Sequence, residues 1–289
     1  MRISANDRPT VIILASQPLE NGLSEIFGKR ETASLMIGGS PLIEHVLNEL
    51  HDLNFTQCIV LARSNARDIY KMVAGFQHWA MNIEVMSYAL SKDEVLREFK
   101  SMSEPSGLLL IDANQLRSKS IKEFLDNCNK SDYLLYDAEK ENNQLGLTYL
   151  KPSKADFIIN AKPISMPEVM VNRLTTTRDF QKANLDLIMG RYDGLEASVS
   201  CHAIGPRLEH WSAKVHRRNN IDSASVMIDR HCCIERNVSL SSVVLNRDVY
   251  IEHNTILENT IVMPDAVIPA NQYIRNAIIQ GNTIYTVCD

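Results

Sequence analysis

The chain has 289 residues, of which 45% are apolar and 22% are charged, and its formal net charge at pH 7 is -5. This composition supplies enough apolar surface for a globular core, and the length suits one large or two ordinary domains. The mild acidity excludes a general electrostatic attraction to nucleic acid or to anionic membranes.

The sequence favours a cytoplasmic protein with reduced thiols. It contains no apolar run of the ~18 residues that a membrane span requires, and the polar residues 1–10 lack the apolar stretch of a signal peptide. Its six cysteines are scattered and form no CxxC pair. Cys232 and Cys233 are adjacent, but neighbouring side chains of a strand point to opposite faces and cannot easily share one metal ion. We therefore expect neither a membrane span nor disulfides.

The first two-thirds of the chain alternate between short apolar runs and helical patterns. Runs typical of buried strands occur at 11–15, 58–61, 83–86, 107–112, 133–136 and 146–150. Apolar residues at helical spacing predict helices from Pro41 onward and near 65–77, 92–102 and 118–129. This alternation predicts a mostly parallel sheet covered by helices on both faces.

A domain boundary is expected near residue 194. Residues 151–172 are predicted to be irregular because they contain three prolines. Thr177 is then typical of the N-cap of a helix, and that helix is expected to stop near Gly190 and Gly194. The sequence thus predicts an α/β domain over residues 1–194 and a second domain over residues 195–289.

From about residue 226 the aliphatic residues recur every six positions. The anchors are Ile228, Ile234 and Leu240, then after a one-residue slip Leu245, Ile251, Leu257 and Met263, with a further phase of Val262, Ile268 and Ile274. A six-residue period suits a triangular coil in which each flat face takes one hexapeptide and one aliphatic side chain fills the interior. The pattern predicts a short left-handed parallel β-helix of hexapeptide repeats, and the alternative is an antiparallel sheet with polar turns.

Asparagines are expected at the corners of these coils, because asparagine tolerates left-handed backbone angles. The candidates are Asn237, Asn246, Asn254, Asn259 and Asn276.

Four segments of the chain carry motifs of a known family. They are LMIGGSPLIEHVL at 35–47, LLID at 109–112, TTTRDFQKAN at 175–184 and ENTIVMP at 258–264. Together they resemble the sugar-1-phosphate nucleotidyltransferases, and in particular mannose-1-phosphate guanylyltransferase-like members with a C-terminal β-helix. The resemblance implies a Rossmann-like nucleotidyltransferase domain in nucleotide-sugar and polysaccharide biosynthesis. It also implies attack of a sugar-1-phosphate on a nucleoside triphosphate, with Mg²⁺ held by two aspartates.

The sequence departs from this family where phosphate should bind. The loop at 15–23 contains Pro18 and Glu20 where the family has glycines and a basic residue, so the backbone N–H groups cannot cradle a triphosphate. The position of the second metal-binding aspartate falls on Arg173 by direct counting. Removing one charge-stabilising group from such a site typically costs about 3–4 kcal/mol, so several losses together leave little catalysis.

The candidate site residues are Asp112, Lys29, Arg30 and Gly22. Asp112 matches the remaining metal-binding and catalytic aspartate of the family, although a carboxylate at a strand end can also cap the next turn. Lys29 and Arg30 are candidate catalytic cations that could reach a phosphate. Gly22 is the one glycine of the 15–23 loop and the candidate for contact with a nucleotide.

We therefore expect a nucleotidyltransferase-like protein with weak or lost catalysis and a regulatory or scaffolding role. It would bind a nucleotide or nucleotide sugar, and form a homo-oligomer or a complex with an active relative. One alternative is an active, Mg²⁺-dependent nucleotidyltransferase with a rearranged phosphate loop.

A second alternative is a hexapeptide acyltransferase with a histidine as general base. Its candidates are His202, His210, His216, His231 and His253. Trp211 and the basic run 214–218 are expected in a linker before the repeat, in a solvated or interface role.

Overall fold

The computed structural model describes residues 8–63, 66–74, 81–88, 91–103, 106–130, 132–141, 143–152, 161–199 and 208–287. The chain divides into two compact units. The first comprises Met1–Leu19, Lys29–Leu35 and Pro41–Arg173, and the second comprises Glu20–Gly28, Met36–Ser40 and Leu174–Asp289. The second unit therefore begins at Leu174 and not near the expected boundary at residue 194, and it includes two early segments as well.

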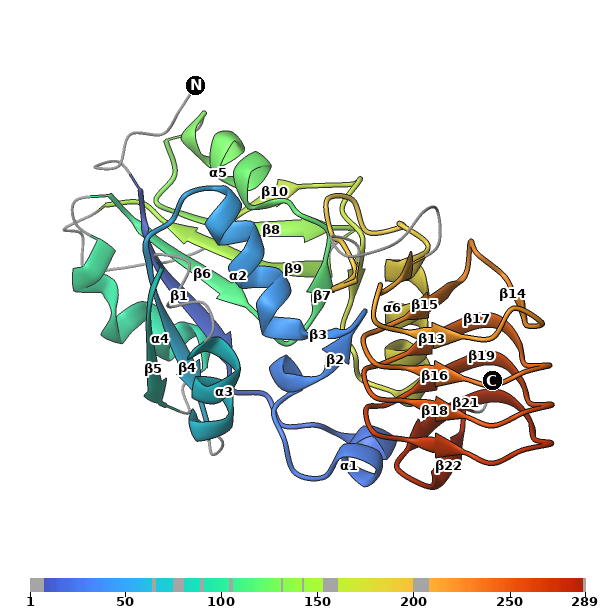
Figure 1. Cartoon of the computed structure of the whole chain (residues 1–289). Helices are drawn as coiled ribbons and strands as arrows, with labels where there is room; N and C mark the ends of the chain where they lie inside the picture. Colours follow the sequence, from blue (N-terminus) through green and yellow to red (C-terminus); the bar gives the residue numbers. More distant parts are fainter. Residues whose placement is uncertain are drawn as a thin grey trace. The chain divides into compact units, whose positions relative to one another are not determined.

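Among the described residues, the first unit forms a seven-stranded sheet (Figure 1). Its order is β10 (Lys162–Ser165), β8 (Leu135–Lys140), β9 (Asn143–Leu150), β6 (Leu108–Asp112), β1 (Thr10–Ala15), β4 (Gln57–Ala62) and β5 (Asn82–Ser87). Neighbouring strands are parallel except that β9 is antiparallel to both β6 and β8. The expected mostly parallel α/β sheet is confirmed.

Helices cover both faces of this sheet. On one face α2 (Leu42–Asp52), α3 (Ala66–Val73) and α5 (Ile121–Asn129) bury Leu47, Ile69 and Phe124. On the other face Val95 and Leu96 of α4 (Lys92–Glu98) pack against the side chains of β1 and β6 that point to that face. Residues 11–15 of strand β1 are all apolar, and they enter the cores on the two faces of the sheet alternately. Phe76, expected in the helix near 65–77, lies outside the described residues.

Short elements complete the description. They are the 3₁₀ helices η2 (Thr32–Ser34) and η4 (Lys100–Ser103) and the strands β2 (Met36–Ile37), β3 (Ser40–Pro41), β7 (Leu116–Arg117) and β11 (Val171–Asn172). Strands β10 and β11 lie in the stretch expected to be irregular, so that expectation was wrong. Pro163 is tolerated in β10 because β10 is an edge strand of the sheet.

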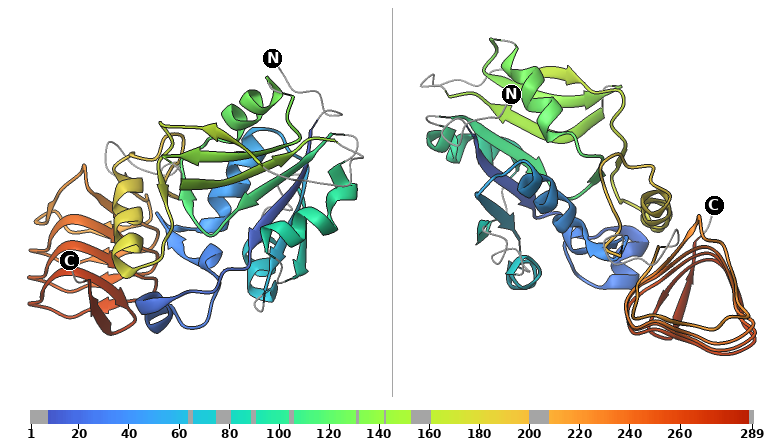
Figure 2. Two further views of the ribbon diagram at one scale, coloured as in Figure 1. Left: turned by 180° about the vertical axis from the view of Figure 1, so that it is seen from behind. Right: turned by 45° about the horizontal axis from the view of Figure 1, so that its top comes forward.

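The second unit contains α1 (Asn21–Phe27), α6 (Thr177–Ile188) and a three-sided stack of short strands (Figure 2). The strands are β12 (Leu208–Glu209), β13 (Lys214–Val215), β14 (Asn220–Ile221), β15 (Val226–Ile228), β16 (Cys233–Ile234), β17 (Ser239–Leu245), β18 (Tyr250–Ile251), β19 (Ile256–Val262), β20 (Val267–Ile268), β21 (Tyr273–Gln280) and β22 (Thr283–Thr286). Successive coils pair in parallel, and only the final β22 turns back antiparallel on β21 among the residues described. The antiparallel-sheet alternative for this region is therefore wrong.

The repeat unit of the stack explains the slip in the sequence pattern. Tyr250 pairs with Val267, and Ser239 pairs with Ile256, so equivalent residues are 17 apart. Three faces of six, six and five residues account for each coil from β15 onward, and the slip recurs there. The coil before it is two residues longer, because Lys214 pairs with Cys233 and Asn220 pairs with Ser239, 19 positions further on. The buried aliphatic residues that follow this spacing are Ile228, Ile234, Leu240, Leu245, Ile251, Leu257, Val262, Ile268, Ile274 and Ile279. Val262, and not Met263, continues this interior column.

Left-handed backbone angles mark the corners of the coil. The corner residues with positive φ are His231, Asn237, Ser242, Asp248, Asn254, Asn259, Asp265, Asn271 and Asn276. Side-chain amides join equivalent corners: Asn237 donates to Asn254, and Asn254 donates to Asn271, both at 3.1 Å. The corner assignment is wrong for Asn246 alone among the five candidates, because its side chain is buried and donates to the Val262 carbonyl at 2.8 Å.

One face of the coil is covered by α6. The outward column Met227, Val244, Ile261 and Ile278 is fully buried, and α6 packs against β17 and β19. The helix starts with a capping box in which Thr176 accepts from the Asp179 N–H and Asp179 accepts from the Thr176 N–H. The N-cap is thus Thr176, one residue before the expected Thr177. In Figure 2, α6 runs along the axis of the stack.

Candidate functional site

The candidate site lies at the carboxyl end of β6. The chain runs from β1 to β4 and β5 on one side, and then returns to β6 on the other side of β1. Ligands of open α/β sheets bind at such a change of direction, outside the carboxyl ends of the strands. Asp112 is the last residue of β6 and pairs in register with Leu14 of β1. The fold therefore places the expected aspartate at the position where a ligand would bind.

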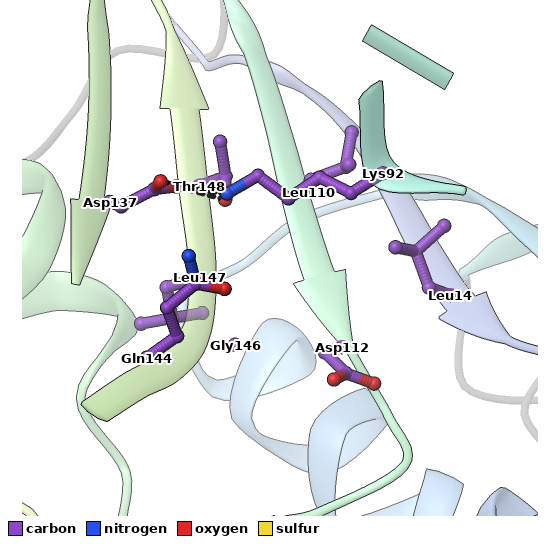
Figure 3. Close-up of a pocket in the computed structure, with 9 residues that line it drawn as sticks. All are labelled: Leu14, Lys92, Leu110, Asp112, Asp137, Gln144, Gly146, Leu147 and Thr148. Atoms are coloured by element: carbon purple, nitrogen blue, oxygen red, sulfur yellow. Dashed lines mark hydrogen bonds and ion pairs between the residues drawn. The ribbon is translucent and has the colours of Figure 1, made fainter. Parts of the chain in front are cut away.

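A small hollow of about 150 Å³ opens beside Asp112, on the face of the sheet that α4 covers in part. It is lined by Leu14, Lys92, Leu110, Asp112, Asp137, Gln144, Gly146, Leu147 and Thr148 (Figure 3). Leu14 of β1 and Leu110 of β6 supply apolar wall, whereas polar groups come from α4, β6, β8 and β9. Figure 3 shows Lys92 extending across Leu110 toward Asp137 and Thr148.

An ion pair closes one side of this hollow. Lys92 Nζ donates to both carboxylate oxygens of Asp137 at 2.7 Å, and Thr148 Oγ1 donates to Asp137 Oδ1 at 2.5 Å. Lys92 lies in the first turn of α4, where the helix dipole disfavours a cation. Asp137, whose side chain is only 10% exposed, provides the compensating charge. The Lys92 ammonium is therefore already committed within the protein.

Asp112 caps the turn that follows β6. Its Oδ1 accepts from the Asn114 backbone N–H at 2.9 Å and from Asn114 Nδ2 at 2.7 Å. Burial raises the pKa of Asp112, while these hydrogen bonds and the charges of Arg117 and Arg173 act in the opposite direction. Asp112 thus caps the following turn through Oδ1, as the structural alternative for this residue predicted.

Gln115 and Gly146, which are not among the candidate residues predicted from the sequence, also border Asp112. The Gln115 side chain is buried, and its Nε2 has no hydrogen-bond partner among the described residues. Gly146 adopts φ 69°, and a Cβ there would lie 2.1 Å from Gln115 Nε2 and 2.8 Å from Asp112 Cβ. Only glycine leaves room for both side chains. A glycine inside a predicted strand is a signal of such a close approach.

The residues around Asp112 do not suit Mg²⁺, which prefers several oxygen ligands in octahedral geometry. Two arginines act on the carboxylate instead. Arg117 is buried, with Nη2 3.2 Å from Glu49 Oε2 and Nε 2.9 Å from Ser120 Oγ. Arg173 is exposed and Nη2 donates to Asn143 Oδ1 at 3.4 Å. In the part of the chain described, no group of three or more His, Cys, Asp or Glu residues could hold a metal ion.

The other candidate site residues occupy different elements. Lys29 and Arg30 are exposed, and the Arg30 carbonyl accepts from the Leu19 N–H at 2.8 Å, beside the loop that leaves β1. Gly22 belongs to the second unit, in the first turn of α1, where a Cβ would lie 3.1 Å from Thr177 Cγ2. Residues 21–23 are thus helical, and the expected phosphate loop ends at Glu20.

Two of the segments behind the family resemblance meet inside the second unit. Asn184 Oδ1 of α6 accepts from the Gly38 N–H at 2.9 Å, and the Gly38 carbonyl accepts from the Ser198 N–H at 2.8 Å. A Cβ on Gly38 would lie 2.4 Å from Leu187 Cδ2. These motif residues therefore fasten a tight turn to α6, which gives them a structural role.

The basic run before the repeat is part of the coil and not a linker, because β13 pairs in parallel with β16. His216 Nδ1 accepts from the Arg218 N–H at 3.2 Å, and His253 Nδ1 lies 3.0 Å from Glu235 Oε2. His202 lies outside the described residues. Trp211 is exposed and lies against the ring of His210, with a centroid distance of 5.5 Å.

The described cysteines are free thiols. They are Cys58, Cys128, Cys232 and Cys233, whereas Cys201 and Cys288 lie outside the described residues. Burial raises the pKa of Cys58, Cys128 and Cys232 to about 12, so these three are protonated at neutral pH and are poor nucleophiles.

Comparisons with known proteins add no assignment: no protein-family model matches the chain, and no curated protein matches it. None of the helices in the described part of the chain is long and apolar enough to cross a membrane.

Proposed function

We propose that this chain is a nucleotidyltransferase-like protein of nucleotide-sugar biosynthesis in which catalysis is weak or lost. In this proposal the first unit is a Rossmann-like domain and the coil of the second unit is a left-handed β-helix. The strand order β5-β4-β1-β6 supports the first part, because it matches the 3-2-1-4 portion of the doubly wound order, which is one mononucleotide-binding half and the first strand of the next. The 17-residue parallel coils support the second.

The observation that carries the proposal is the charge around Asp112. A Mg²⁺-dependent phosphoryl site collects carboxylates around the metal. Here the charges of Arg117 and Arg173 act to lower the pKa of Asp112. Arg173 occupies the position where the family resemblance implies the second aspartate. An arginine supplies positive charge permanently, so it takes the electrostatic place of the metal without its Lewis acidity.

The loop after β1 also supports weak or lost catalysis. Pro18 has no backbone N–H, and Glu20 adds negative charge next to where phosphates would bind. Gln17 and Leu19 are engaged by Thr32 and Arg30 in a short antiparallel contact. The Leu19 N–H and the Gln17 carbonyl are therefore used in hydrogen bonds within the protein. Because these features argue against catalysis, we propose a regulatory or scaffolding role that involves binding a nucleotide sugar.

The test is a pyrophosphate-release assay with each nucleoside triphosphate, mannose- or glucose-1-phosphate and Mg²⁺. The proposal expects no release above the rate of the Asp112→Ala variant, together with calorimetric binding of at least one nucleotide sugar. Metal-dependent release that Asp112→Ala abolishes would reject it.

An active nucleotidyltransferase is the second candidate, and one observation favours it. The contact between residues 17–19 and 30–32 holds Arg30 beside the loop that leaves β1, in the same unit as Asp112. A cation there can neutralise a phosphate. This candidate expects pyrophosphate release by the unmodified protein that falls in both Arg30→Ala and Asp112→Ala. No release by the unmodified protein supports lost catalysis.

We also propose that the coil forms a contact with a second copy or with an active relative. Its outward side chains Ile256, Val267, Tyr273 and Ile284 are 40–61% exposed. Light scattering at several protein concentrations tests self-association, and a monomer at every concentration would leave only the complex with a relative.

A further inference from the structure

We infer that the first turns of the coil carry a docking surface for an acidic polypeptide segment. The surface, called here the arginine patch, consists of exposed side chains at Trp211, Lys214, Arg217, Arg218, Arg230, Arg236 and Arg247. It lies on the sheet that contains β13, β16 and β18 and at the two ends of those strands (Figure 1). This inference goes beyond the proposed function, because it concerns a surface of the second unit and does not depend on catalysis.

Strand pairing aligns the side chains of the arginine patch on successive turns of the coil. The first two turns pair at a spacing of 19 residues, so Trp211 lies beside Arg230. By the same spacing Arg217 lies beside Arg236. The next spacing is 17 residues, so Arg247 follows Arg230. With strands about 4.8 Å apart and about 3.3 Å per residue along a strand, the patch measures roughly 10 Å by 20 Å.

Positive charge is concentrated in these turns, although the whole chain has a net charge of -5. Residues 210–221 and 230–241 together contain five Lys or Arg residues and one carboxylate. Residues 247–258, on the following turn, contain one arginine and three carboxylates. The patch is therefore a local reversal of the charge of the chain, and it attracts an anionic partner.

The protein itself does not neutralise the cations of the arginine patch. None of their side chains forms an ion pair or a hydrogen bond with another residue in the described part of the chain. Glu235, the one carboxylate among them, is engaged elsewhere. Tyr250 donates to its Oε1, and the His253 N–H donates to its Oε2 at 3.0 Å. The guanidinium groups thus remain available to a partner.

The residue types of the patch favour a polypeptide as the partner. Five of its six cations are arginines, and a guanidinium group binds a carboxylate through two parallel hydrogen bonds. Protein interfaces are enriched in arginine and tryptophan and depleted in lysine. Trp211 is 66% exposed, and its ring rests against His210, whose Nδ1 lies 2.9 Å from Ser212 Oγ. It offers apolar contact beside the arginine row.

The dimensions and surroundings of the patch suit one narrow chain of acidic residues. A flat anionic membrane laid on this sheet would also meet the carboxylates of the following turn. Single-stranded nucleic acid binds where successive bases stack on several aromatic side chains. Trp211 is the one Trp, Tyr or Phe in residues 210–241. Both alternatives therefore fit the patch less well than an acidic polypeptide segment.

The experiment is fluorescence anisotropy of a labelled oligoglutamate peptide titrated with the full chain. We expect binding that weakens as the salt concentration rises, and no binding of an oligoglutamine peptide of the same length. The double variant Arg230→Gln with Arg247→Gln should bind at least tenfold more weakly. Lys122→Gln with Arg275→Gln is the matched control, because it removes the same charge from exposed positions outside the patch, and it should bind normally.

The double variant Arg230→Lys with Arg247→Lys separates carboxylate recognition from general attraction. It keeps both charges but removes both guanidinium groups, so we expect at least threefold weaker peptide binding and an unchanged thermal transition. Full affinity in this variant would overturn the inference, as would the absence of peptide binding by the unmodified chain. Tighter binding of polyuridylate, or of vesicles with equal parts of phosphatidylcholine and phosphatidylserine, would also overturn it. So would self-association through these arginines without peptide binding.

Discussion

At the scale of single residues, the surroundings of Asp112 have opposite effects on the pKa of its carboxyl group. Burial disfavours its charge, while Asn114 and two arginines favour it. The net result is a raised pKa, so the folded state binds the proton more tightly than the unfolded chain does. The contribution of Asp112 to stability is therefore complete below its ordinary value of 3.8 and declines as pH rises through the folded-state pKa.

This sign gives a pH-dependent prediction for Asp112→Asn. The variant keeps the shape and the oxygen acceptor but has no charge to bury, so its stability relative to the wild type should increase as pH rises above 3.8. Urea unfolding midpoints of both proteins between about pH 3.5 and 7 measure this. A difference between the two proteins that is independent of pH would contradict the raised pKa.

At the scale of elements, the N-terminus of α5 is capped from another helix. Glu49 of α2 accepts from the Ser120 and Ile121 N–H groups at 2.6 and 2.7 Å, and its other oxygen pairs with the buried Arg117. Ser120 itself makes no side-chain cap hydrogen bond within the described structure. The carboxylate thus joins α2, α5 and β7.

Glu49→Ala should destabilise the protein by about 3–5 kcal/mol, because it leaves the Arg117 charge buried without its partner. Asn48→Ala, at an exposed position of the same helix, should change stability by at most about 0.5 kcal/mol. Urea denaturation of both variants measures the contrast. An equal loss of stability in both variants would show that the buried Glu49–Arg117 ion pair does not stabilise the contact between α2, α5 and β7.

The turn at Gly38 gives a second prediction for an element. Gly38→Ala combines a positive φ with a Cβ only 2.4 Å from Leu187 Cδ2, so we expect it to cost more than the ~1–2 kcal/mol of left-handed backbone alone. Gly190→Ala is the matched control, because its φ is 69° and nothing lies within 4 Å of the added methyl. Thermal unfolding distinguishes them, and adding Leu187→Ala to Gly38→Ala should recover part of the loss.

Much of the fold was predictable from the sequence, since apolar runs marked most strands of the sheet and six-residue spacing marked the coil interior. Other features depend on neighbours that a linear pattern does not contain. Asn246 looked like a corner residue, but its place on the face next to Leu245 buries it. The meeting of Gln115, Asp112 and Gly146 brings together different parts of the chain, so only Asp112 could be selected in advance.

At the scale of the whole molecule, the second unit is discontinuous in sequence. Its α6 requires the early segments: Phe27 lies 5.1 Å from Phe180 between ring centroids, and Gly38 bonds to Asn184. We therefore expect a fragment of residues 174–289 to unfold at a lower temperature than the coil does in the full chain. Circular dichroism melting checks this, and an unchanged transition would show that the early segments are dispensable.

The length of α6 sets a limit on how the coil can grow. Twelve residues span about 18 Å at 1.5 Å per residue, and four rungs spaced about 4.8 Å apart occupy nearly the same distance. Those rungs are the ones that turn Met227, Val244, Ile261 and Ile278 outward on the face where α6 packs against β17 and β19. If duplication of a 17-residue segment added a rung, its outward aliphatic side chain would extend past the helix into water. A longer descendant would therefore need a polar residue at that position, or a longer α6.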